Sequence, residues 1–514
     1  MAAVEARHAS LWVETAPPAV DHPALEGEAE FDVAVLGGGI TGLLTAILLK
    51  EAGLRVAVVE ADRIGRGVTA HSTVKVTAGH GTRYSELERA FGLDTARVYA
   101  EANAEGLETI ASLVDRLAID CEFERRPTHV WAETAEERER LGREAAVERE
   151  VGLPTSLLDR AEELPFDVTG LLRMDDQAQF HPAKFLAGLA AAVDGGGSAV
   201  FERSRAARVE EEERRCRVSA GEGVLHANHV VVATHYPFLN RGYFFAKLYP
   251  HREYAVALRA GSEASAIRGM YINLGTPTRS LRQAADDAGD LLIVVGEGHK
   301  AGEAAPTDAR YLALEDWGRT FFDAGPPEYR WSTQDPMSMD GLPFVGRIGR
   351  TSDRVWVATG FGTWGMTNAA AAAAILRERI LGNDHPWART FDAQRLTPRQ
   401  SALTFSKENA KVAGHLVGDR LKALAASVRD LAPGEGRVVR RGLHAVGVAR
   451  DDEGRLHAVS AACTHLGCLV AWNGAERSWD CPCHGSRFGM DGRVLHAPAV
   501  EPLESLDPSD LGLG

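Results

Sequence analysis

The sequence has few cysteines and lacks the pattern of a transmembrane segment. Six cysteines in 514 residues are too few for a disulfide scaffold, which small secreted domains use to compensate for a small core. The uncharged apolar run from Val33 to Leu49 contains four glycines and is too short for a comfortable membrane span, and we expect no transmembrane segment. The first residues lack a continuous apolar core. We therefore expect no secretory signal and a cytoplasmic location.

Basic residues are in the minority. Lysine and arginine number 57 against 72 acidic residues, which gives a net charge of −15. Such a balance repels phosphate over most of the surface and argues against a nucleic-acid-binding protein. The 45% hydrophobic and 25% charged content is typical of a globular protein, and the length suggests about three folding units.

Composition and periodicity divide the chain into four parts. Residues 1–30 contain a Pro-Pro pair and no periodicity, which predicts an extension lying over the first domain. Residues 31–392 alternate buried strands, glycine turns and helices, with charged, helix-like sequence over 85–150. Residues 393–429 are basic with an apolar stripe, and they predict either a linker helix docked on the larger domain or a helix that binds a membrane surface or partner. Residues 430–514 are β-rich.

The glycine motif near the N-terminus has the context of a dinucleotide site. Gly37, Gly39 and Gly42 follow a buried strand and open an apolar helix, and a second buried strand, Val56 to Val59, ends in Glu60. Glycines at these places permit a tight turn, close approach of backbone N–H groups to a pyrophosphate, and close packing of helix on strand. The carboxylate of Glu60 can accept hydrogen bonds from both ribose hydroxyls. The pattern predicts dinucleotide binding.

Several separated blocks within 31–392 resemble the FAD-dependent oxidoreductases of the D-amino-acid oxidase and glycine/sarcosine oxidase type. They are E-A-D-R-I-G-R-G-V-T-A-H-S-T from Glu60, A-T-H-Y-P-F at 233–238, D-G-L-P-F-V-G at 340–346 and A-T-G-F-G-T-W-G-M-T-N-A at 358–369. The resemblance implies an α/β, two-part domain, in which a Rossmann-like FAD half is interrupted by a sheet-based substrate half. It also implies roles in FAD binding for Gly65, Gly67, Thr69, Gly360, Gly362 and Gly365. A helix that starts near Met366 would direct its N–H groups at the flavin.

The same resemblance suggests residues near the flavin and the substrate. His71 and Lys75 lie on the segment that runs beside the flavin in such enzymes. Lys75 is expected to be an electrostatic partner of the reduced flavin or else a solvated charge, and His71 is a weaker candidate for covalent attachment. Segment position makes His80, Arg252, Tyr254 and Trp331 substrate-side candidates, although histidines and aromatic residues of this kind are more often packing residues.

Four cysteines and two histidines crowd into the C-terminal part. Cys463-x-His465 and Cys481-x-x-His484 supply two thiolates and two imidazoles on two short loops that can close around one metal centre. Zinc accepts the same four ligands, but zinc fingers seldom space the first pair by one residue. Two further cysteines, Cys468 and Cys483, stand where they would tie the two loops together.

The segments A-C-T-H-L-G-C and C-P-C-H-G-S-R-F resemble the Rieske proteins of respiratory and photosynthetic cytochrome complexes. The resemblance implies a small all-β domain with a [2Fe-2S] cluster, in which Cys463 and Cys481 bind one iron and His465 and His484 bind the other. It also implies a Cys468–Cys483 disulfide and a hydrogen bond from Ser486 to a bridging sulfide. The family's tyrosine that donates to a ligand thiolate is Phe488 here.

A flavin takes electrons in pairs and a Rieske cluster moves them singly. The fusion therefore predicts a dehydrogenase that oxidises a small substrate, such as an amine or amino acid, and passes electrons through the cluster to an external acceptor. The alternatives are reverse flow from a donor protein through the cluster to the flavin, and a redox sensor or electron-transfer module without catalysis. A single dinucleotide motif argues against an NAD(P)H reductase, and without a separate non-haem iron domain a ring-hydroxylating oxygenase is disfavoured.

Overall fold

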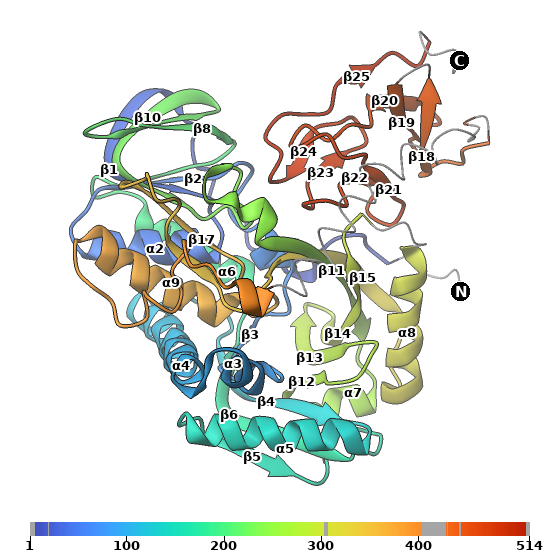
Figure 1. Ribbon diagram of the computed structural model, residues 1–514. Helices are drawn as coiled ribbons and strands as arrows, with labels where there is room; N and C mark the ends of the chain where they lie inside the picture. Colours follow the sequence, from blue (N-terminus) through green and yellow to red (C-terminus); the bar gives the residue numbers. More distant parts are fainter. Residues whose placement is uncertain are drawn as a thin grey trace.

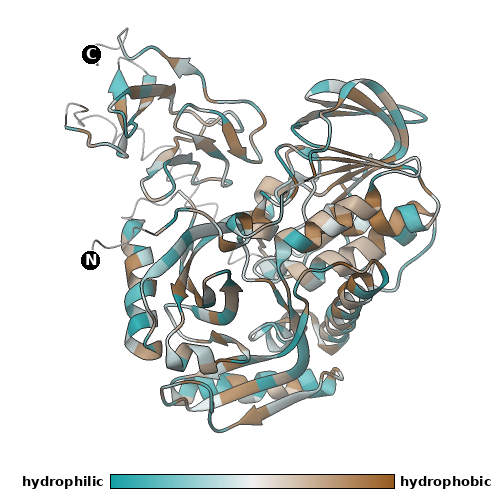
Figure 2. Ribbon diagram, turned by 180° about the vertical axis from the view of Figure 1, so that it is seen from behind, coloured by the Kyte–Doolittle hydropathy of each residue, from teal (hydrophilic) through white to brown (hydrophobic). Residues whose placement is uncertain are grey.

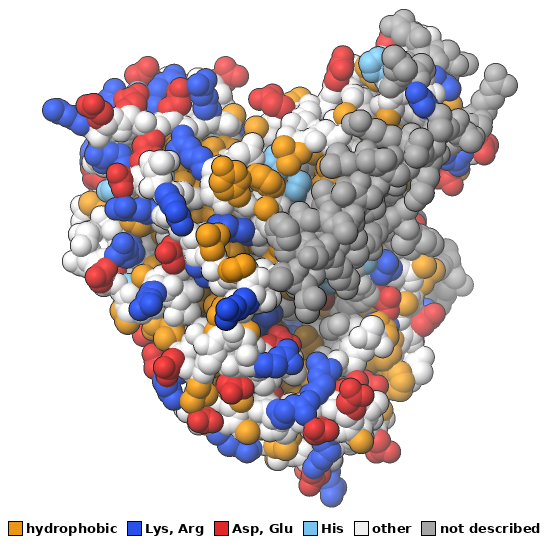
Figure 3. All heavy atoms as spheres, in the orientation of Figure 1, with side chains coloured by type: hydrophobic (Ala, Val, Ile, Leu, Met, Phe, Trp, Pro, Cys, Tyr) orange, Lys and Arg blue, Asp and Glu red, His pale blue; other side chains and the backbone are white. Residues whose placement is uncertain are grey.

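The computed structural model describes residues 6–18, 20–302, 307–401, 428, 430–441 and 444–509. Figure 1 shows a large body containing two sheets and a smaller β-rich part, drawn in red, above the strands labelled β11 and β15. No helix among the described residues is long and apolar enough to cross a membrane. The visible face intersperses acidic and basic side chains (Figure 3).

The first sheet is parallel at its centre. Its main order is β16-β17-β10-β1-β2-β7, with β9 pairing β10 and β8 pairing β9. The strands are β1 (Glu26–Leu36), β2 (Val56–Val59), β7 (Ala199–Phe201), β8 (Ala206–Glu211), β9 (Cys216–Ala220), β10 (Glu222–Val232), β16 (Phe344–Arg347) and β17 (Val355–Thr359). All four residues of β2 are buried, as parallel strands covered on both faces require.

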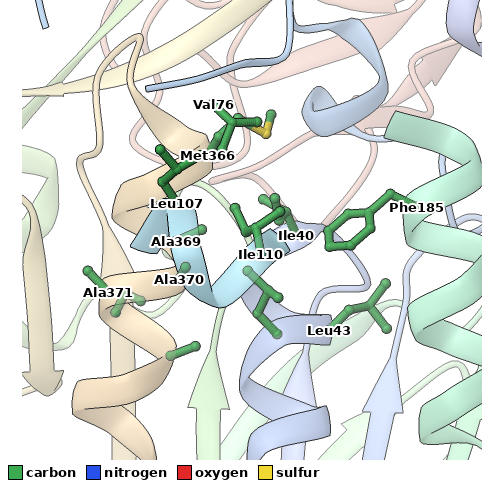
Figure 4. Close-up of a cluster of buried hydrophobic side chains, with 14 of the residues drawn as sticks. Ile40, Leu43, Val76, Leu107, Ile110, Phe185, Met366, Ala369, Ala370 and Ala371 are labelled. Atoms are coloured by element: carbon green, nitrogen blue, oxygen red, sulfur yellow. The ribbon is translucent and has the colours of Figure 1, made fainter. Parts of the chain in front are cut away.

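Helices α2 (Ile40–Glu51), α4 (Leu93–Arg116) and α9 (Gly365–Ile380) pack together beside this sheet (Figure 4). Small residues make the close approach possible. A Cβ at Gly106 would lie 2.5 Å from the carbonyl oxygen of Thr367, and the alanines 369–373 of α9 are all buried. The apolar helices seen from behind in Figure 2 belong to this core. This packing directs the N-termini of α2 and α9 at the same cavity.

The second sheet forms the other half of the large body. Its order is β15-β11-β14-β13-β12-β4-β6-β3, with β5 pairing β6. Its strands are β3 (Lys75–Val76), β4 (Glu124–Ala132), β5 (Thr155–Leu158), β6 (Gly170–Gln179), β11 (Leu248–Arg259), β12 (Met270–Asn273), β13 (Arg279–Asp286), β14 (Gly289–Lys300) and β15 (Pro327–Ser338). The remaining helices of this body are η1 (Val68–His71), α3 (Arg83–Phe91), α5 (Ala135–Glu150), α6 (Pro182–Val193), η2 (Arg241–Ala246), α7 (Ser262–Ala266) and α8 (Asp308–Phe322). This two-part architecture confirms the expected fold class.

The expectation of helix throughout 85–150 is wrong for β4. This segment pairs with β6 and β12 and buries its last five residues, Thr128 to Ala132. Burial inside a sheet decided its conformation, whereas the flanking charged segments are helical as expected.

The C-terminal part consists of two small antiparallel sheets. One has the order β18-β19-β20-β25 and the other β21-β22-β23-β24. The strands are β18 (Gly436–Arg441), β19 (His444–Arg450), β20 (Leu456–Ser460), β21 (Ala471–Asn473), β22 (Ser478–Asp480), β23 (Arg487–Gly489), β24 (Val494–His496) and β25 (Ser505–Leu506). The expected all-β domain is confirmed.

The two terminal segments of the large domain pack onto it. In the N-terminal extension, α1 (Leu11–Glu14) buries Trp12, whose indole N–H donates to the Ser72 carbonyl at 2.9 Å. Arg395 pairs with Asp340 at 2.8 Å. Residues 402–427 and 429 of the predicted basic linker lie outside the described residues, so its helical character stays a prediction.

Buried charges join the two domains. Arg252 of β11, with no exposed surface, donates to Ser332 and Gln334 of β15 and lies 3.1 Å from Asp480 of the C-terminal domain. Although burial alone would raise the pKa of Asp480, Arg252 and Arg487 lower it to about 2. Gln334 also donates to the Gly485 carbonyl at 2.8 Å. These contacts hold the smaller domain against β11 and β15.

Replacing Arg252 by Met should destabilise this junction. The substitution keeps a long side chain but leaves Asp480 without its partner across the interface, and loss of one member of a buried pair costs about 3–5 kcal/mol. Arg217→Met, which removes a half-exposed pair with Glu210, is the matched control and should cost less than about 1 kcal/mol. Thermal unfolding followed by visible circular dichroism measures both. Equal effects of the two substitutions would contradict the interface role.

Candidate functional site

A long cavity lies between the two sheets. Its wall includes the turn after β1, the segment from Arg66 to Lys75, the ends of β10 and β17, and side chains from β11 and β15. The N-termini of α2 and α9 face it, which favours an anionic ligand.

The glycine turn fits a dinucleotide. Gly37 has φ +110°, and a Cβ there would meet the Ala233 carbonyl at 2.5 Å. A Cβ at Gly42 would lie 1.9 Å from the Gly37 carbonyl oxygen, so helix and strand can pack only on glycine. A Cβ at Gly39 would meet only Thr69 Oγ1, at 3.4 Å, and Gly39 lines the cavity. The space above Gly39 is therefore available to a ligand.

Glu60 lies at the end of β2 and lines the same cavity. Its carboxylate accepts hydrogen bonds from the backbone N–H groups of Gly38 (2.7 Å) and Asp62 (2.9 Å), and burial raises its pKa. Gly67 and Thr69 line the same cavity. Thr69 Oγ1 accepts a hydrogen bond from the Ile40 N–H at the start of α2. Gly360, Gly362 and Gly365 lie at its other end, beside the start of α9.

His71 and Lys75 also line the cavity. Lys75 Nζ donates to the Tyr271 carbonyl at 2.5 Å and to the Ser280 hydroxyl. Burial, with a smaller contribution from Arg282, lowers the pKa of Lys75 to about 7. Burial also lowers the pKa of His71, whose Nδ1 donates to the Gly67 carbonyl at 2.9 Å.

Four substrate-side candidates lie outside the cavity lining. His80 is buried against Tyr99 and stacks on Trp364, a lining residue, at 4.5 Å between ring centroids. Trp331 donates to the His71 carbonyl at 3.0 Å. Tyr254 hydrogen-bonds His299 at 3.1 Å, and Arg252 lies at the domain junction.

Strand alternation explains where Arg252 and Tyr254 point. Successive side chains of a strand face opposite sides of the sheet, and on β11 it is Glu253 and Ala255 that line the cavity. Thr333 and Asp335 of β15 line it as well, and the Thr333 hydroxyl is buried without a hydrogen-bond partner among the described residues. Sequence reasoning missed these groups. Period-two alternation puts Glu253 and Ala255 on the face opposite Arg252 and Tyr254, but it does not say which face meets the FAD half.

The four predicted cluster ligands come together on two loops of the C-terminal domain. The rings of His465 and His484 lie 5.0 Å apart, and the Nδ1 atom of each is buried without a hydrogen-bond partner among the described residues. Burial lowers the pKa of His465 to about 4 and that of His484 to about 3, so both imidazoles are neutral. A hydrogen bond from Cys481 lowers the pKa of Cys463 to about 7. Two adjacent thiols and two free imidazole nitrogens fit a two-iron cluster.

A disulfide joins the ligand loops. Cys468 and Cys483 are bonded to each other, with Cα atoms 6.6 Å apart. The sulfurs of Cys468, Cys481 and Cys483 lie within 4.8 Å of one another, but the disulfide leaves only Cys481 of the three able to bind metal. The Ser486 hydroxyl accepts from the Ala499 N–H at 3.0 Å and also lies within hydrogen-bonding reach of Cys463.

The two sites share a wall. Leu495, His496 and Ala497, all from the C-terminal domain, line the cavity between the sheets. His496 Nδ1 donates to the Ala497 carbonyl, so its Nε2 accepts from Nδ1 of His235 at 3.1 Å. His235 follows β10, has φ +64°, and its Nε2 lies 3.7 Å from Asp335.

Comparison with known proteins agrees with this geometry. The FAD-dependent oxidoreductase family matches residues 32–379, and the Rieske [2Fe-2S] domain matches residues 422–507. The Rieske 2Fe-2S iron-sulfur protein YhfW of Bacillus subtilis (strain 168) is 34% identical over 94% of this chain and 95% of its own length. Gamma-glutamylputrescine oxidoreductase of Escherichia coli (strain K12) is 25% identical over 70% of this chain and 85% of its own length. Glycine oxidase from Geobacillus kaustophilus superposes with a TM-score of 0.59 at 18% identity, covering 71% of this chain and 99% of that one.

The fold and the two sites define an oxidoreductase with two redox cofactors, FAD and a Rieske [2Fe-2S] cluster. The chain belongs to the FAD-dependent oxidoreductase family and carries a C-terminal Rieske domain. The Rieske match assigns an iron–sulfur cluster, and not zinc, to the cysteine and histidine ligands of the C-terminal domain. The assignment of individual residues to FAD and to the substrate stays a prediction.

Gly39→Val should abolish FAD binding and leave the cluster intact. The backbone at Gly39 is extended, so valine is tolerated there, but its side chain would project into the space predicted for the pyrophosphate. Flavin absorbance and iron content of the purified variant measure the two cofactors separately. Gly142→Val, at a half-buried position of α5 with open space around it, is the control. Normal flavin content in Gly39→Val would contradict the assignment.

Phe488→Tyr should raise the reduction potential of the cluster. Phe488 has no exposed surface, so a new hydroxyl there has no water to bind and is expected to donate to a ligand sulfur. Reduction adds negative charge to the cluster, so a donor stabilises the reduced form more. If about 1 kcal/mol of the hydrogen bond differs between redox states, the shift is about 40 mV upward. Protein-film voltammetry measures it. An unchanged or lowered potential with full cluster content would show a different loop geometry.

Proposed function

We propose that this protein oxidises a small amine or amino acid at the FAD site, with electron transfer between FAD and the Rieske cluster and onward to an external acceptor. The proposal rests on the wall that the flavin cavity and the cluster domain share. A cluster domain that lines the flavin cavity through His496 is placed to exchange electrons with that cavity. When bound, FAD supplies two-electron chemistry and the cluster one-electron chemistry.

Acidic side chains of the second sheet favour a cationic substrate. Glu253 and Asp335 present two carboxylates to the cavity, and both come from strands of the second sheet. Lys75 lines the same cavity from β3, at the other end of the strand order, and its ammonium already donates to Tyr271 and Ser280. The carboxylates can bind a substrate ammonium, and the name of the gamma-glutamylputrescine relative is consistent with an amine. Within this class we therefore favour an amine.

Proton transfer can be assigned to Lys75. With a pKa of about 7, this amine exists in both protonation states near neutral pH. Its neutral form can accept a proton from the bound substrate, and the Ser280 hydroxyl holds it in place. The Thr333 hydroxyl, which has no hydrogen-bond partner in the described part of the chain, lines the same cavity and is available to orient the substrate.

The test is an anaerobic screen of amines, amino acids and NAD(P)H, with flavin bleaching and cluster reduction followed together. We expect an amine to reduce both centres in wild type, and to reduce only the flavin in His465→Ala. Glu253→Gln should raise the amine concentration needed for half-reduction about 10- to 100-fold, the equivalent of one charge-assisted hydrogen bond. Glu108→Gln, on the surface, is the control.

Two results would contradict the proposal. Flavin reduction by NAD(P)H alone would replace the amine with a nicotinamide donor. Flavin reduction by an amine in wild type with the cluster remaining oxidised would exclude electron transfer between the centres.

A further inference from the structure

One segment of the FAD domain covers the cluster site. This cap segment, residues 235–245, follows β10 and touches the Rieske domain at several points. His235 binds His496, Asn240 Oδ1 accepts from Nε2 of His465 at 3.2 Å, and the ring of Phe245 meets that of His484 edge-on at 6.0 Å. Both histidine ligands and His496, at the end of β24, are therefore in contact with the FAD domain.

Tyr236 lies within the cap segment and has a hydroxyl without a partner. The residue is 2% exposed, and its hydroxyl makes no hydrogen bond among the described residues. Its ring belongs to an apolar cluster with Phe238 and Phe244, against which Ala497 and Val500 of the Rieske domain pack. Buried hydroxyl groups without partners are rare, because the lost hydration is not replaced. The position therefore calls for a hydrogen-bond acceptor close to the Rieske domain.

A thiolate can accept this hydrogen bond, and we consider the cluster ligand Cys481 as its source. Burial raises the pKa of Tyr236, and the negative charge of Cys481 raises it further. The phenol is therefore protonated and able to donate. The Rieske domain lies against the cap segment on both sides of Tyr236, where His496 contacts His235 and His465 contacts Asn240. Phe488, inside the Rieske domain, has no hydroxyl to offer.

We propose that the hydroxyl of Tyr236 in the FAD domain donates a hydrogen bond to sulfur on the Cys481 side of the Rieske cluster, and so raises the cluster's reduction potential. The inference rests on the unpartnered buried hydroxyl and on the contacts made by residues 235 and 240 on either side of it. The cap segment then acts on the cluster in two opposite ways. Tyr236 donates toward sulfur and favours the reduced state, whereas Asn240 accepts from a histidine ligand and favours the oxidised state.

The experiment compares midpoint potentials of full-length holoprotein by voltammetry at one pH. Tyr236→Phe keeps the ring and its packing, and it should weaken one-electron reduction about fivefold, a downward shift of about 40 mV. Asn240→Ala should shift the potential upward. Tyr329→Phe removes a tyrosine hydroxyl that contacts Asp286, away from the Rieske domain, and should leave the potential unchanged.

A second measurement does not depend on the size of the shift. Pulsed electron paramagnetic resonance of the reduced cluster in D₂O should show an exchangeable deuteron in wild type that is missing in Tyr236→Phe. Phe488→Tyr added to Tyr236→Phe should recover part of the lost potential. An unchanged potential and an unchanged deuteron signal in Tyr236→Phe, with full cluster content, would overturn the proposal. None of these readouts needs substrate turnover, so the proposal can fail independently of the proposed function.

Discussion

The buried ion pair between Arg252 and Asp480 is the interaction on which the arrangement of the two domains depends. Both side chains are buried, so the charge of each must be balanced inside the protein. Asp480 directly precedes the ligand Cys481, and Arg487 and Glu476 extend the charged network on the Rieske side. A pair this deeply buried fixes the orientation of the cluster loops relative to the flavin cavity.

Once the Rieske domain is held in this position, one stretch of chain serves both sites. Residues that follow β10 line the flavin cavity through Thr234 and His235 and then continue across the cluster ligands as far as Phe245. His496 approaches the same stretch from the Rieske domain. One short stretch of chain thus connects the flavin cavity with the cluster ligands through hydrogen bonds to His496 and His465.

Features encoded by neighbouring residues could be predicted from the sequence. The strand–glycine–helix unit depends on local backbone geometry at Gly37 and Gly42, and the cluster ligands lie within two short loops, so both appeared in the sequence directly. The direction of side chains on β11 depends on which face of the sheet meets the FAD half. Nothing local distinguishes Glu253 from Arg252 in that respect. The contribution of His496 to the cavity depends on how the two domains dock, and no local sequence pattern encodes that arrangement.

The disulfide between Cys468 and Cys483 bears on how the cluster is lost and restored. Metal sites usually come apart when the ion leaves, since ligands on separate loops regain their freedom. Here a covalent bond links the two loops that carry all four ligands, across 15 residues of sequence. Its main effect is to limit the conformations open to the iron-free chain. Demetallated protein should therefore keep its ligands near one another and accept a new cluster without refolding, as long as the thiol environment leaves that bond oxidised.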